Sequence, residues 1–133
     1  MLEYERKGYV SVWLGCFPNT STCEEYLTET YNEDGDASSP FWSDLGVGWL
    51  DHDLQEAHYE ESGPVPVEQF FRRGLSYLDS FREPLLEACR KRGIQSAGAV
   101  IFVFDLVYPE QQPFPSPYLK FVGAFAYGVE DRE

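Results

Sequence analysis

The sequence predicts an α+β fold, in which helices pack on one face of a small, mostly antiparallel sheet. Three observations predict it. Segments 9–14 and 118–128 have the two-residue period of strands. A continuous apolar run at 97–107 is typical of a strand buried on both faces. The segments between them have helical spacing. The predicted order is strand, helix, irregular segment, two helices and two strands, which favours α+β over alternating strands and helices.

The first strand is predicted at Tyr9–Leu14, between Gly8 and Gly15. Successive side chains of a strand point to opposite faces. One face should therefore carry Val10, Val12 and Leu14, and the other Tyr9, Ser11 and Trp13.

The first helix is predicted to begin at Ser21, because Glu24 three residues later completes a capping box. Residues at helical spacing continue to Tyr31, and we expect that face to pack on the core. Its members are Cys23, Tyr26, Leu27, Thr30 and Tyr31.

The middle of the chain predicts little regular structure. Segment 32–40 is a loop by composition, and Phe41–Leu45 forms a short helical turn before two glycines. Trp49–Asp51 is read as a short strand. Asp51–Glu61 fits neither the helical nor the strand period.

Two further helices are predicted in the second half. Pro66 is placed to begin a short one, which Gly74 ends and which carries Val67, Phe70 and Phe71 on one side. Ser80 opens the other with Glu83 as its capping partner, and Gly93 ends it. The second helix should bury Phe81, Leu85, Ala88 and Cys89 and pair Glu87 with Lys91.

The last strand is predicted at Tyr118–Gly128, after a proline-rich loop that cannot pair as a strand. Regular alternation would place Leu119, Phe121, Phe125 and Tyr127 on one face. Either outer strand of the sheet could leave a free edge that pairs with another copy, so the oligomeric state stays open.

Length and composition favour one globular domain over residues 1–133, since 43% of the residues are hydrophobic. The net charge of −13 argues against nucleic acid or an anionic membrane as a partner. Most of that charge lies in residues 1–63, which hold 14 acids and 2 bases. From Glu24 to Glu61 there are 12 acids and no Lys or Arg, which indicates an acidic surface.

No segment has the pattern of a targeting peptide or a membrane span, so we expect a cytosolic protein. The odd number of cysteines, Cys16, Cys23 and Cys89, favours reduced thiols. A nucleophile built from Cys16 or Cys23 with His52 or His58 is an alternative without a specific spacing to support it. No glycine-rich loop joins a strand to a helix, so no nucleotide cofactor is expected.

One cluster has residue types suited to a metal site: Asp51, His52, Asp53 and His58. Its spacing matches neither a zinc-protease helix nor a calcium loop. A solvated acidic segment is the favoured interpretation, and no metal is expected. A small metal-dependent hydrolase is the alternative function.

Aromatic residues are interspersed with acidic ones through the same region, a pattern that suits a protein interface. Large aromatic side chains anchor interfaces, and carboxylates attract a basic partner. The sequence favours neither the core nor the surface for Trp42, and favours the core for Trp49. The predicted partner-binding residues are Asp34, Asp36, Trp42, Asp44, Trp49, Asp51, Asp53 and Glu56.

Several motifs, taken in order, resemble the immunity proteins of bacterial polymorphic-toxin systems, specifically family 22. They are Val10–Gly15, Glu25–Leu27 with Tyr31, Phe41 with Asp44–Val47, the acidic segment Trp49–Glu56, Ala99–Asp105 with Tyr108, and Phe121–Tyr127. The resemblance implies a small cytosolic α+β protein that binds and neutralises a cognate toxin domain. Such toxins are often nucleases with a basic substrate cleft, which an acidic protein would block by occupying or covering it.

Overall fold

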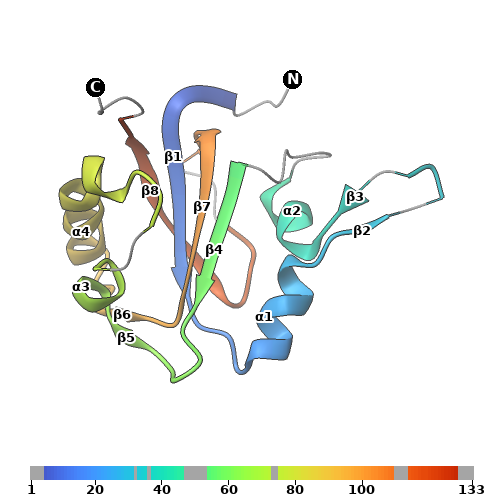
Figure 1. Cartoon of the computed structure of the whole chain (residues 1–133), viewed down its shortest axis with the longest axis horizontal. Helices are drawn as coiled ribbons and strands as arrows, with labels where there is room; N and C mark the ends of the chain where they lie inside the picture. Colours follow the sequence, from blue (N-terminus) through green and yellow to red (C-terminus); the bar gives the residue numbers. More distant parts are fainter. Residues whose placement is uncertain are drawn as a thin grey trace.

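The computed structural model describes the chain with short gaps, over residues 5–31, 33–35, 37–46, 54–72, 75–109 and 114–128. Within these ranges the central feature is a four-stranded antiparallel sheet with strand order β4-β7-β1-β8 (Figure 1). The strands are β1 (Glu5–Gly15), β4 (Gln55–Tyr59), β7 (Ala99–Leu106) and β8 (Leu119–Ala126). The α+β class and the mostly antiparallel sheet are confirmed.

The helices cover both faces of this sheet, where one covered face was expected. Figure 1 shows α1 (Thr20–Leu27) and α2 (Pro40–Leu45) on one side, and α3 (Val67–Phe70) and α4 (Arg82–Lys91) on the other. The reason is that β1 and β7 are apolar on both faces, and each face must be kept from water. No helix in the described ranges is long and apolar enough to cross a membrane.

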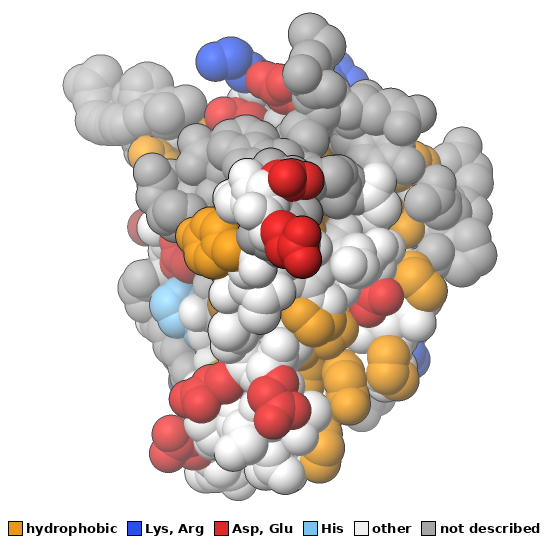
Figure 2. Space-filling model, turned by 90° about the vertical axis from the view of Figure 1, so that its right-hand side faces the viewer, with side chains coloured by type: hydrophobic (Ala, Val, Ile, Leu, Met, Phe, Trp, Pro, Cys, Tyr) orange, Lys and Arg blue, Asp and Glu red, His pale blue; other side chains and the backbone are white. Residues whose placement is uncertain are grey.

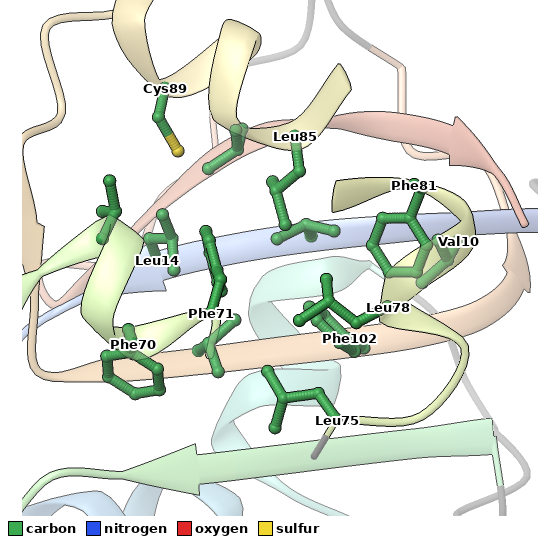
Figure 3. Close-up of a cluster of buried hydrophobic side chains, with 14 of the residues drawn as sticks. Val10, Leu14, Phe70, Phe71, Leu75, Leu78, Phe81, Leu85, Cys89 and Phe102 are labelled. Carbon is green, nitrogen blue, oxygen red and sulfur yellow. The ribbon is translucent and has the colours of Figure 1, made fainter. Parts of the chain in front are cut away.

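The two faces bury separate hydrophobic clusters. On the α1/α2 side, Trp13 is surrounded by other rings, with Phe41 at 5.3 Å between ring centroids and Phe121 also at 5.3 Å. On the α3/α4 side, the helices cover Val10, Leu14 and Phe102 of the central strands (Figure 3). The strand face predicted for Val10, Val12 and Leu14 is therefore confirmed.

Helix α1 begins and ends earlier than predicted. Its N-cap is Asn19, whose side chain accepts the backbone N–H of Thr22 at 2.8 Å. An Asn at this position satisfies a free amide of the first turn, so the capping box at Ser21 is not used. Cys23 and Tyr26 are buried as expected.

The end of the predicted helix is instead a small hairpin. Strand β2 (Thr30–Tyr31) pairs with β3 (Ala37–Ser38). The expectation that Tyr31 faces the core is wrong, because its side chain is 68% exposed. Thr30 is exposed as well.

Helix α2 confirms the predicted helical turn at Phe41–Leu45. Ser39 caps its first turn by accepting the N–H of Trp42 at 3.1 Å, and Pro40 occupies a first-turn position that tolerates a missing N–H. Gly46 ends it with φ of +85°, in the left-handed region that glycine adopts without strain.

The described part of the acidic segment 51–61 contains strand β4, which the sequence did not predict. β4 is an edge strand, paired only with β7, and none of its residues is fully buried. An edge strand with few apolar residues, such as β4, leaves no hydrophobic pattern that would reveal it. The strand predicted at Trp49–Asp51 lies outside the described residues.

Helices α3 and α4 lie close to their predicted positions. Val67, Phe70 and Phe71 are buried as expected, whereas Gly74 lies outside the described residues. Ser80 does not cap α4: it closes a 3₁₀ turn, η2 (Leu78–Ser80), and α4 follows without a side-chain cap.

Helix α4 buries its apolar side and carries an ion pair on its outer side. Phe81, Leu85 and Cys89 are fully buried beneath the helix, and Ala88 is partly buried. Glu87 pairs with Arg90 at 2.8 Å, in place of the predicted Lys91.

The β8 alternation is interrupted by a bulge. Val122 is the extra residue, since Val12 pairs with Gly123 while Trp13 pairs with Phe121. Leu119 and Phe121 consequently face α1 and α2, whereas Phe125 and Tyr127 pack on the other cluster. The prediction that all four share one face is wrong. Two short strands, β5 (Val65–Pro66) and β6 (Ser96–Ala97), form a separate pair.

Candidate partner-binding surface

Four exposed acids of the first half lie on one side of the molecule. Glu24 and Glu25 lie on α1, and Glu33 and Asp34 lie in the turn between β2 and β3, all four exposed. We name the exposed surface of α1 and the β2–β3 hairpin the acidic face. Figure 2 shows acidic side chains at the centre and the lower end of this side, with basic side chains only at its margins.

An exposed aromatic ring stands beside these acids. Tyr31 on β2 is one of the two exposed large hydrophobic side chains in the described ranges, at 68%. The hairpin that carries it projects away from the sheet (Figure 1). The sequence placed Tyr31 on a buried helix face, so this surface feature was missed. Helix α1 ends at Leu27, with Thr28 as its extended C-cap, so Tyr31 lies beyond the helix.

Trp42, the predicted aromatic anchor, lies in the core. Its side chain is 1% exposed, and its indole N–H donates to Gln55 Oε1 at 3.0 Å. Helix α2 places Phe41, Trp42 and Leu45 against the sheet, because these residues recur on its apolar side. In this position Trp42 offers a partner no contact area, and its expected role as an anchor is not supported.

Asp44 is engaged inside the molecule. Its carboxylate accepts the hydroxyl of Tyr26 at 2.6 Å. Burial, and then this hydrogen bond, raise the pKa of Tyr26 above its usual 10. Asp44 therefore joins α2 to α1, the helix that carries part of the acidic face.

Glu56 is likewise engaged. Its Oε2 lies 2.8 Å from His58 Nε2 and accepts the backbone N–H of Ser76 at 3.2 Å. Burial raises the pKa of Glu56, but the hydrogen bonds from Ser76 and His58 outweigh it and lower the pKa below 4.5. This carboxylate fastens β4 to the loop before η2.

Four predicted binding residues, Asp36, Trp49, Asp51 and Asp53, lie outside the described residues. Asp34 is therefore the predicted acid that the described structure places exposed on the acidic face.

A comparison with protein-family models identifies the family of this chain. The model of the family described as Immunity protein 22 matches residues 10–128, from β1 to just past β8. The chain belongs to the Immunity protein 22 family. No significant match was found among curated proteins or among solved structures.

Membership of this family implies that the chain neutralises a toxin. Immunity proteins act as non-enzymatic inhibitors, so the chain is a binding protein rather than an enzyme. The described ranges contain no group of three or more His, Cys, Asp or Glu that could hold a metal ion. Of the hydrolase cluster, Asp51, His52 and Asp53 lie outside those ranges.

Cys23 and Cys89 do not have the features of a nucleophile. Burial, and then the nearby charge of Glu24, raise the pKa of Cys23 above 9.0, and burial raises that of Cys89 to about 11. A reactive thiol needs the opposite shift, which favours the thiolate. Cys16 is exposed.

Proposed function

We propose that this family member is a cytosolic immunity protein that binds a basic, nuclease-type toxin domain through the acidic face. The observation that carries the proposal is the exposure of Glu24, Glu25 and Glu33 together with Tyr31 on one side of the molecule. The sequence between Lys7 and Arg72 contains no Lys or Arg.

Each component has a physical role in such an interface. A nuclease cleft is basic because it binds phosphates, so carboxylates attract it over several ångströms and raise the association rate. Tyr31 supplies a rigid ring that can enter a pocket of the toxin and lose little conformational entropy. Occupation of the cleft then excludes nucleic acid from the toxin.

Association kinetics with the toxin test this proposal. The binding partner for the measurement is the product of the neighbouring reading frame, where a cognate toxin gene is expected, with a substitution that disables it. The acidic-face variant Glu24→Gln/Glu25→Gln/Glu33→Gln should lower the association rate constant by about tenfold and weaken its dependence on ionic strength. The matched control neutralises three exposed acids on the α3/α4 side, Glu68→Gln/Glu83→Gln/Glu87→Gln, and has the same net charge.

Two further variants separate the parts of the interface. Tyr31→Ala should act mainly on the dissociation rate, because a buried anchor holds the complex together once it has formed. Asp51→Asn/Asp53→Asn/Glu56→Gln tests the acids predicted from sequence alone. If the acidic-face variant and its control bind at the same rate, the acidic face is not the binding surface.

A further inference from the structure

The two edges of the central sheet differ in how they are protected. Natural sheets block their edges with bulges, cationic side chains or proline, since a free edge pairs with any available strand. At the β8 edge, Val122 forms a bulge, and the guanidinium of Arg92 donates to the Val122 carbonyl at 2.8 Å. Lys120 is exposed on the same strand.

The β4 edge carries none of these devices. Gln55–Tyr59 contains no Lys, Arg or Pro. It pairs with β7 in an unbroken register, and no strand in the described ranges lies on its outer side. Ala57, the central residue, is exposed and small, so the edge can be approached closely. Within the described ranges, the protective features of β4 are its short length and the carboxylate of Glu56.

The hydrogen-bond direction along β4 follows from one contact just beyond its end. Glu60 N–H donates to the Gly98 carbonyl at 2.8 Å, across the β4–β7 ladder. Backbone groups in an antiparallel strand point alternately to either side. Residues 56 and 58 therefore bond to β7, whereas the N–H and C=O groups of Gln55, Ala57 and Tyr59 point outwards.

We infer that this edge pairs with β4 of a second copy of the chain, antiparallel and centred on Ala57. This is the symmetric register that aligns all five residues of the strand. It joins Ala57 to Ala57, and Gln55 to Tyr59 at either end, each pair exchanging two backbone hydrogen bonds. The product is one continuous sheet across both copies, with α1 and α2 covering one face of each half.

Side-chain charge favours the same register. Glu56 and His58 lie on one face of β4, with Glu56 Oε2 2.8 Å from His58 Nε2. The two-fold axis at Ala57 places each Glu56 directly opposite the other copy's His58. Two opposed pairs result, and the positions are self-complementary, as a two-fold interface requires. A strand with like charges in these positions would oppose the pairing.

The net charge of −13 opposes association and supplies a diagnostic. Two strongly acidic copies repel each other, and added salt screens that repulsion. Self-association should therefore strengthen as ionic strength rises, whereas binding to a basic toxin weakens. The two interactions are distinguishable in this way, and the dimer does not depend on the acidic face.

Sedimentation velocity of the purified full chain, from micromolar to millimolar concentration and at low and high salt, tests the inference. We expect a monomer–dimer equilibrium that salt shifts towards the dimer. Ala57→Pro should lower the association constant by about tenfold or more, because it removes the outward N–H at the centre while sparing the ladder to β7. The matched control is Ala126→Pro on β8. Tyr127 N–H bonds inwards to the Gly8 carbonyl, so the N–H of exposed Ala126 points outwards at the other edge.

Hydrogen exchange gives a second measurement that does not depend on a variant. On concentration into the dimer range, the amides of Gln55, Ala57 and Tyr59 should gain protection, while those of Glu56 and His58 stay protected throughout. A chain that is monomeric under all these conditions overturns the inference. This holds even if the toxin is then found to bind at the β4 edge. A dimer that survives Ala57→Pro, or that Ala126→Pro dissolves, overturns it as well.

Discussion

Gly15 lies so close to Tyr118 that no side chain fits between them. A Cβ on Gly15 would lie 1.8 Å from the carbonyl oxygen of Tyr118, well inside any allowed contact. The next amide, Cys16 N–H, bonds to that same oxygen at 3.1 Å. The end of β1 is thus fixed against the start of β8 by the absence of a side chain.

Gly15→Ala should therefore be strongly destabilising. The methyl group must push the two backbones apart and break the hydrogen bond at Cys16, so we expect a loss of about 3 kcal/mol in the free energy of unfolding. Gly98→Ala is the matched control, since a Cβ there would meet its nearest atom at 3.8 Å. Urea denaturation compares the two, and equal stabilities would contradict the close approach.

Trp42 is expected to contribute to stability and not to binding. Trp42→Ala removes a fully buried ring and leaves Gln55 without its donor, so the free energy of unfolding should fall by about 3–5 kcal/mol. Tyr31→Ala, at an exposed ring, should change it by less than about 0.5 kcal/mol. Thermal and urea unfolding measure both. A Trp42→Ala protein of normal stability that no longer binds the toxin would restore Trp42 as an anchor.

Acid should weaken the fold through Glu56. Its pKa in the folded chain is below 4.5, so its contribution is present above pH 4.5 and is lost as the pH falls through the lowered value. Glu56→Gln should cost about 1 kcal/mol at neutral pH, because the bonds to His58 and Ser76 weaken, and should flatten the stability curve below pH 4.5. Exposed Glu61→Gln is the control and should keep the wild-type acid limb.

The strands that the sequence predicts are those buried on at least one face. β1 and β7 carry runs of large apolar residues because each is covered on both sides, and that pattern stands out in any window. β4 has neighbours on one side only, so polar Glu56 and His58 are tolerated there and leave no hydrophobic signal. The bulge at Val122 depends on pairing with β1, which local sequence does not encode.

The candidate site was likewise predictable only in part. The acidic stretch follows from charge, which a single sequence contains in full. Which acids are free to meet a partner depends on contacts distant in sequence: Asp44 meets Tyr26 18 residues away, and Glu56 meets Ser76 20 residues away. Tyr31 is exposed because α1 ends at Leu27, before this residue is reached, and Trp42 is buried because α2 packs it against the sheet.

Alkaline pH should destabilise the chain through two tyrosines. Tyr26 donates to Asp44 at 2.6 Å and Tyr127 donates to Asp105 at 2.7 Å. Burial first, and then these carboxylate partners, raise the pKa of both above 10. The folded chain thus keeps both phenols neutral where the unfolded chain begins to ionise them.

The contribution of these phenols is therefore complete below pH 10 and is lost as the pH rises towards the raised pKa values. Between pH 10 and the raised values, each tyrosine should lower the free energy of unfolding by up to about 1.4 kcal/mol per pH unit. Tyr26→Phe/Tyr127→Phe should lose stability at neutral pH, about 1.5 kcal/mol for each bond to a carboxylate, but should show a flatter alkaline limb. Tyr31→Phe, at an exposed ring, is the control and should follow the wild type. Urea denaturation from about pH 8 to about pH 11 measures the slope, and a double variant with the wild-type slope would show that these two bonds do not set it.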